Sequence, residues 1–158
     1  MESTIVIQIL KTARDEFLTT ARATPADKAN WRPLEIGRSV ADLATANRIA
    51  ARNYERILVS RGEDIPTPEE FWSQVTVQAQ DTVENETAAI EASTDRLFAV
   101  LAGYTETDWS RVIHVRTPRA LRSQPALTWA LSFNRAFYTR IGQINYIQRL
   151  YGDDEMHR

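Results

Sequence analysis

The feature of this sequence that most constrains its fold is the helical spacing of its apolar residues. Four long segments carry apolar side chains at three- and four-residue steps, which is the pattern of a helix with one buried face. Ser39 and Asp42 provide a start signal for the second segment, and a glycine follows each of the last three. The pattern predicts helices over residues 6–21, 40–57 and about 72–102, and from Pro125 to Gly152. We therefore expect an all-α four-helix bundle whose long connections allow a crossover.

One segment, "RVIHVRT" at residues 111–117, alternates apolar and polar side chains like a strand. It is short and has no evident partner strand, so we expect no sheet here. The arginines of this connection are expected to be solvated. The tryptophans are expected to anchor the core or the loops rather than to bind a ligand.

Length and composition indicate one domain over residues 1–152, followed by a short polar tail at 153–158. The chain has no cysteine, which excludes disulfides, thiolate metal ligands and a cysteine nucleophile. A net charge of −2 gives no electrostatic attraction to nucleic acid or to an anionic membrane. The N-terminus makes a poor signal peptide, and no stretch approaches the ~18 apolar residues of a membrane span. These features predict a cytoplasmic protein.

The predicted second and fourth helices carry small and polar residues beside their main apolar faces. On the fourth helix, a second stripe flanks the main face and widens the sector that points into the bundle: Trp129, Phe133, Ala136, Arg140 and Ile147. On the second helix, Ala46 and Asn53 flank the main face, and Asn47 lies on it. Alanines and polar groups that face each other leave room for a cavity, and cavities in helix bundles are common ligand sites.

Two segments carry a family resemblance: "NWRPLEIGRSVADLATA" at 30–46 and "LTWALSFNRAFYTRIGQINYIQRLYG" at 127–152. They resemble the DinB/YfiT-like superfamily of four-helix bundles. Members of that family have a tryptophan–proline segment before helix two, a Ser/Thr cap followed by a histidine seven residues on, and a helix-four pattern His-x-x-x-His-x-Gly-Gln. The Gly142–Gln143 pair is part of the match. The resemblance covers nearly the whole chain and implies an up-down-down-up bundle that forms a homodimer.

The resemblance also implies a metal site, which this sequence does not provide. In the family, three histidines hold a divalent cation that activates a thiol for transfer or isomerisation. The corresponding positions here are Ala46, Ala136 and Arg140. Alanine has no donor atom and a guanidinium repels cations, so we expect no metal and no cofactor. His114 and His157 lack the spacing of a helical metal site, and amide oxygens alone bind transition metals poorly.

Arg140 then has two interpretations, because a buried guanidinium is costly unless it is paired. It could form an ion pair that fills the former metal cleft, with one of four acidic residues: Glu69, Glu70, Glu91 or Asp95. It could instead bind the carboxylate or phosphate of a small ligand, since its planar fork matches such groups. In the second case, the candidate cleft residues are Arg140, Asn47, Asn134, Ala46, Ala136 and Trp129.

The function predicted from sequence is a DinB-like protein of undetermined activity, free of metal, with a small anionic ligand between helices two and four. Two enzymatic alternatives stay open. One is a metal-independent thiol transferase or isomerase in which Arg140 stabilises developing negative charge. The other is a metal-dependent relative whose ligands lie elsewhere in the sequence. No nucleophile or general base is evident, which favours the binding function.

Overall fold

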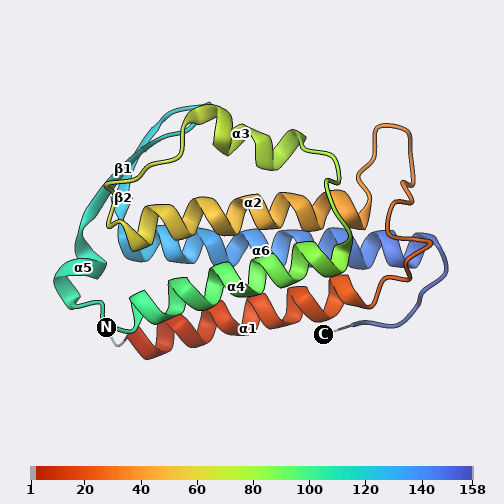
Figure 1. Cartoon of the computed structure of the whole chain (residues 1–158), viewed down its shortest axis with the longest axis horizontal. Coiled ribbons are helices and arrows are strands. Elements are labelled where there is room, and N and C mark those ends of the chain that lie inside the picture. The colour runs from red at the N-terminus through yellow and green to blue at the C-terminus, as the bar shows by residue number, and fades with distance from the viewer. Residues whose placement is uncertain (1–2, 158) are drawn as a thin grey trace.

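The computed structural model describes residues 3–157, apart from the side chain of residue 74. Its four long helices are α1 (Ser3–Arg22), α2 (Val40–Val59), α4 (Val83–Leu101) and α6 (Ala126–Leu150). In Figure 1, α1 and α6 run in one direction, and α2 and α4 run in the other. Both α1 and α2 contact α4 and α6, so the four helices close into a ring. The expected up-down-down-up bundle is confirmed.

The helix predicted over residues 72–102 is wrong, because two helices occupy that stretch. The first, α3 (Pro68–Thr76), ends where Val77 becomes extended, and α4 begins after a new cap at Thr82. The Thr82 hydroxyl accepts a hydrogen bond from the Asn85 N–H at 3.2 Å and so starts a separate helix. Figure 1 shows α3 outside α2, within the crossover that lets α4 run parallel to α2.

The expectation of no sheet is also wrong. After the short helix α5 (Glu106–Ser110), β1 (Val112–Arg116) pairs antiparallel with β2 (Leu121–Pro125), with His114 opposite Ser123. The alternation seen in the sequence matches the burial of β1, where Ile113 and Val115 are buried and their neighbours are exposed. The partner strand β2 has no such alternation, because its residues are mostly exposed. This hairpin lies beside the end of α2 and the start of α6 (Figure 1).

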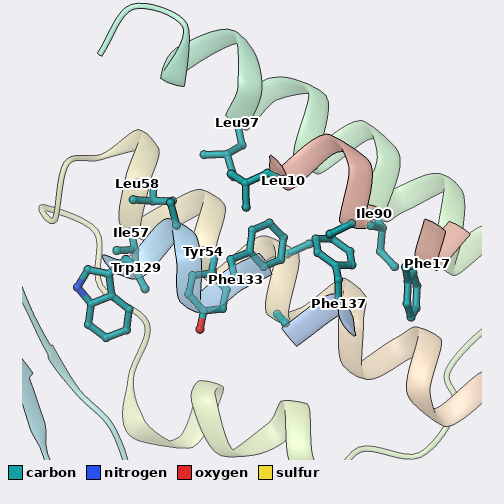
Figure 2. Close-up of a cluster of buried hydrophobic side chains, with 14 of the residues drawn as sticks. Leu10, Phe17, Tyr54, Ile57, Leu58, Ile90, Leu97, Trp129, Phe133 and Phe137 are labelled. Carbon is teal, nitrogen blue, oxygen red and sulfur yellow. The ribbon is translucent and has the colours of Figure 1, made fainter. Parts of the chain in front are cut away.

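Apolar faces of the four long helices meet in one core, and an aromatic row runs through it (Figure 2). Phe133 stacks on Tyr54 with ring centroids 4.8 Å apart, and Phe137 lies between Phe133 and Phe17. The row therefore joins α1, α2 and α6, and Tyr54 forms its outer end. Within residues 3–157, no helix is both long and apolar enough to cross a membrane.

The start of α2 is fixed by the capping box that the sequence predicts. Ser39 Oγ accepts from the Asp42 N–H at 3.1 Å, and Asp42 Oδ2 accepts from the Ser39 N–H at 2.8 Å. Asp42 also accepts from Arg32 and, at 2.7 Å, from the N–H of Ala79. One buried carboxylate thus ties the segment before α2 and the segment after α3 to the same helix end.

The polar tail folds back onto the bundle. After α6, Gly152 adopts a positive φ of 97°, which turns the chain, and Asp153 pairs with His157 at 2.9 Å. The Thr20 hydroxyl on α1 donates to the carbonyl of His157 at 2.6 Å. His157 is therefore held against α1 by contacts that have no link to the α2–α6 cleft.

Candidate functional site: a cleft between α2 and α6

Arg140 reaches from α6 to α2 and contacts Asn47. Its Nη1 donates to Asn47 Oδ1 at 3.0 Å and to the Ala136 carbonyl of the preceding turn at 3.2 Å. Arg140 Nε and Asn47 Nδ2 are both fully buried, and neither has a hydrogen-bond partner within the described residues. Buried donors are rarely left unsatisfied in native proteins. Within the described chain these two N–H groups have no acceptor, and a water molecule or a ligand oxygen could bind both.

No described carboxylate pairs with Arg140. Of the four acids proposed from sequence, Glu70 pairs with Arg56, Glu91 pairs with Arg22 and Asp95 pairs with Arg14. The fourth, Glu69, is exposed beside the turn of the hairpin and does not reach Arg140. The interpretation of Arg140 as one half of an ion pair is therefore wrong.

Burial and a neighbouring positive charge both disfavour the protonated form of Arg140. Burial lowers the pKa of Arg140 to about 10, the nearby positive charge of Arg38 acts in the same direction, and Tyr54 opposes them. Burial also lowers the pKa of Arg38, although Asp42 counteracts the effect. With a pKa of about 10, Arg140 is still protonated at neutral pH. The Arg140 side chain is therefore positively charged, and no carboxylate within residues 3–157 forms an ion pair with it.

A cavity of about 310 Å³ lies beneath α3 and the turn of the hairpin, and neither Arg140 nor Asn47 lines it. We call it the aromatic pocket, and its walls are formed by Tyr54, Phe71, Trp72, Val75, Thr117, Pro118, Arg119, Arg122 and Trp129. Burial raises the pKa of Tyr54, and the charges of Arg135, Arg140 and Arg122 act against that rise. The charges that act on the Tyr54 hydroxyl are thus all guanidinium groups.

Sequence reasoning found only part of this pocket. Trp129 was proposed for the cleft; its Nε1 donates to the Ile113 carbonyl at 3.3 Å and its ring lies 6.4 Å from that of Tyr54. Tyr54 lies seven residues after Asn47, so helical periodicity places it on the same inward face of α2. The sequence predicts no hairpin, and it assigns Trp72 and Val75 to the start of one long helix rather than to a separate α3, so neither set of residues could be placed beside Tyr54. The sequence feature that could have indicated a pocket here is Trp72, an aromatic residue beside the proline-containing segment at 65–68.

The remaining predicted site residues are placed as follows. Ala136 touches Arg140 through its carbonyl, and Ala46 is fully buried on α2 next to Asn47. Asn134 precedes Arg140 by six residues on α6, a turn of about 120° around the helix axis. Asn134 makes no hydrogen bond to Arg140, and its Oδ1 is buried without a partner in the described chain. The structure therefore groups Arg140, Asn47 and Ala136, with Trp129 in the adjoining pocket.

The arrangement of these helices matches several solved structures. A histidine-to-alanine mutant of the mycothiol-dependent maleylpyruvate isomerase superposes with a TM-score of 0.70 and 15% identity, over 93% of this chain and 66% of that one. YjoA, a DinB-like protein from Bacillus subtilis, gives a TM-score of 0.69 and 14% identity, over 97% and 96%. The chain has the DinB/YfiT-like four-helix-bundle fold.

A third structure with the DinB/YfiT-like fold also matches. YfiT from Bacillus subtilis, described as a probable metal-dependent hydrolase with an unusual four-helix bundle topology, gives a TM-score of 0.67 and 16% identity, over 94% of this chain and 85% of that one. The present chain spans only about two thirds of the isomerase's length. No family model and no curated protein matches it in sequence. At these identities, the likeness establishes the fold alone.

The residues at the position implied for a metal in the DinB/YfiT-like fold do not fit a divalent cation. Ala46 is buried and has no donor, and the Ala136 carbonyl already accepts a hydrogen bond from Arg140. Arg140 itself is protonated at neutral pH and would repel a cation. His114 lies on the hairpin, with Nδ1 2.7 Å from Ser123 Oγ. Among the described residues, no three His, Cys, Asp or Glu side chains form a metal-binding group.

Proposed function

We propose that this protein binds a small organic anion, a carboxylate or phosphate, in the α2–α6 cleft through Arg140 and Asn47, and that it does so without a metal. The observation that carries the proposal is the half-buried Arg140, which has no carboxylate partner while its Nε and the neighbouring Asn47 Nδ2 lack acceptors in the described chain. An oxyanion accepts from a guanidinium edge and from an amide N–H, and charge-assisted bonds of this kind are among the stronger hydrogen bonds.

Such an anion would relieve the unfavourable environment of Arg140. The ligand would supply the missing counterion in a site where a second guanidinium, that of Arg38, lies nearby. A ligand that binds only the folded state stabilises it by mass action, by about 2.7 kcal/mol at a concentration of one hundred times Kd. Binding should therefore appear directly as a rise in melting temperature.

Thermal melts at matched ionic strength test this proposal. Acetate, butyrate and phosphate are titrated against chloride as the reference anion, with wild-type protein and Arg140→Met. We expect at least one oxyanion to raise the wild-type melting temperature with concentration, and Arg140→Met to lose that rise.

Arg135→Met is the matched control, since Arg135 is an exposed arginine on the same helix and its replacement removes the same charge. It should keep the rise in melting temperature. Equal shifts for wild type and Arg140→Met, or no shift with any of the three anions, would contradict the proposal.

The second candidate function is a metal-independent thiol transferase or isomerase, favoured by the structural likeness to the mycothiol-dependent isomerase. In that case Arg140 would stabilise negative charge that develops on a bound substrate. The metal-dependent version is tested by elemental analysis of protein purified without an affinity tag. We expect no stoichiometric transition metal, and one equivalent of zinc or nickel per chain would favour the metal-dependent activity instead.

A further inference from the structure

We infer that the ligand of this cleft is an elongated carboxylate whose far end is aromatic or apolar and occupies the aromatic pocket. This inference rests on the proposed function, because it assigns the acidic end of the ligand to Arg140 and Asn47. It adds a second subsite, formed by α3 and the hairpin turn together with α2 and α6. It therefore narrows the ligand from any small oxyanion to an amphipathic acid.

The walls of the aromatic pocket favour a flat apolar group. Tyr54 and Trp129 form one side, and Phe71, Trp72 and Val75 of α3 form the other. Trp72 and Val75 are large apolar side chains that remain 46% and 52% exposed. A volume of about 310 Å³ accommodates a ring-sized group and lies at the small end of the usual range for ligand sites. A bound ring would remove this apolar surface from water.

The pocket and Arg140 lie on the same seam between α2 and α6. Asn47 and Tyr54 are seven residues apart on α2, which places them on one helical face with a rise of about 10 Å between them. On the facing helix, Phe133 stacks on Tyr54, and Arg140 follows it two turns later. The guanidinium of Arg140 folds back onto the preceding turn of α6, where Nη1 donates to the Ala136 carbonyl.

The Tyr54 hydroxyl marks the point where the two subsites meet. In Figure 2, Tyr54 lies between Phe133 and Trp129, and its oxygen points away from Phe133, toward α3. The charge of Arg140 acts on this hydroxyl, and Tyr54 also lines the pocket. The rise between Asn47 and Tyr54 on α2 gives about 10 Å as the length that a ligand needs to join Arg140 to the pocket.

The rim of the pocket selects against positively charged ligands. Arg119 and Arg122 line it, and neither forms an ion pair with a described carboxylate. Cationic groups would be repelled both there and at Arg140. A neutral aromatic ring would not be repelled by these arginines, and guanidinium groups can also stack on such rings. The ligand class is thus an aryl-substituted or long-chain carboxylate rather than an amine or an amino acid with a basic side chain.

Isothermal titration calorimetry with three probes tests this inference: 4-phenylbutyrate carries both ends, butyrate carries only the acid, and 4-phenylbutan-1-ol carries the ring without a charge. We expect 4-phenylbutyrate to bind wild-type protein roughly tenfold to a hundredfold more tightly than butyrate, as expected for burial of a ring-sized apolar group. The alcohol should bind more weakly than 4-phenylbutyrate, because it cannot pair with Arg140.

Two variants locate the ring. Trp72→Ala should abolish most of the advantage of 4-phenylbutyrate and leave butyrate affinity unchanged. Val75→Glu, which puts a negative charge at the pocket, should weaken 4-phenylbutyrate by a similar factor. Tyr138→Ala is the matched control, because Tyr138 is an exposed aromatic residue on α6 that does not line the pocket, and it should leave all three affinities unchanged.

The outcomes separate this inference from the proposed function. If butyrate binds through Arg140 but 4-phenylbutyrate binds no more tightly, or if Trp72→Ala keeps the full advantage, the aromatic subsite is overturned and the anion site stands. If both acids bind equally well to wild type and to Arg140→Met, or if neither binds wild type, the proposed function fails and the inference fails with it.

Discussion

Arg140 is half-buried and, unlike the buried Arg14, has no acidic partner among the described residues. Arg14 is 5% exposed, yet it pairs with Asp15 at 2.8 Å and with Asp95, and its guanidinium lies over the Phe98 ring. Within the described chain, the acceptors of Arg140 are the Asn47 amide oxygen and the Ala136 backbone carbonyl. A charge that is desolvated without compensation lowers stability. An anionic ligand at Arg140 would supply this missing compensation.

At this scale we predict opposite effects for the two arginines. Arg140→Met removes an uncompensated charge but loses the hydrogen bond to Asn47, so the free energy of unfolding without ligand should stay unchanged or rise by up to about 2 kcal/mol. Arg14→Met should lower it by about 1–3 kcal/mol, since its acidic partners are partly exposed. Urea unfolding measures both. A loss of more than about 2 kcal/mol in Arg140→Met would indicate a structural lock instead.

The sequence was sufficient to bring Arg140 close to Asn47 and Ala136, because helical periodicity fixes which residues share a face. It could not identify the partners of the acidic residues. Glu91, for example, belongs to α4 and pairs with Arg22 of α1, and that contact depends on how α4 is rotated within the bundle. Long charged side chains can reach several neighbours, so their pairing follows from tertiary packing rather than from local pattern.

At the scale of elements, Asp42 holds the start of α2 and two connections around it. Burial alone would raise the pKa of Asp42, but hydrogen bonds from Arg32 and from the N–H groups of Ser39 and Ala79 outweigh burial and lower it. A carboxyl with a lowered folded-state pKa contributes stability that is present above its unfolded pKa, near 4, and is lost as the pH falls through the folded value.

We therefore expect Asp42→Asn to lower the free energy of unfolding at pH 7 by about 2–4 kcal/mol and to reduce its dependence on pH below about 4. Urea titrations at pH 7, 4 and 3 measure both effects. Asp154→Asn, a change at an exposed carboxylate of the tail, should leave the wild-type pH profile intact. A variant profile as steep as that of wild type would show that Asp42 is not the group responsible.

Gly62 follows the end of α2, packs against Ile113 of the hairpin and leaves no room for a side chain. Its φ is +90°, and a Cβ there would lie 2.9 Å from Ile113 Cγ2. Gly62→Ala should therefore lower the free energy of unfolding by about 1–3 kcal/mol.

Gly142→Ala should have the opposite effect. This exposed glycine of α6 has open space around it, so the change should raise the free energy of unfolding by about 0.5–1 kcal/mol. Thermal melts that show equal effects for both would contradict this account.

The four long helices could be predicted because each repeats an apolar stripe over many turns. The break between α3 and α4 was missed, since both helices are amphipathic and only the capping residue Thr82 marks the second start. The hairpin was missed because β2, "LRSQP", is mostly exposed and therefore has no apolar alternation. Both α3 and the hairpin cover the aromatic pocket. The pocket residues that they contribute could therefore not be predicted from the sequence.

For the whole molecule, we predict a homodimer, which rests mainly on the family resemblance and on the prevalence of closed two-fold pairing. The outer face of α6 offers a surface for it, since four large apolar side chains there are exposed: Leu131, Tyr138, Tyr146 and Leu150. Light scattering in dilute solution should give twice the chain mass of 18.0 kDa. A monomeric mass throughout the micromolar range would contradict the prediction.

The central claim is that an anion, and no metal ion, occupies the position beside Arg140. The most direct measurement follows the side-chain Nε–Hε resonances of ¹⁵N-labelled protein during titration with 4-phenylbutyrate, with Arg140 assigned by its absence in Arg140→Met. We predict that the Arg140 resonance shifts saturably, together with the side-chain amide of Asn47, while the resonance of Arg14 stays in place. An Arg140 resonance that does not move at millimolar concentrations of the acid, but moves or disappears on addition of one equivalent of zinc, would contradict the account.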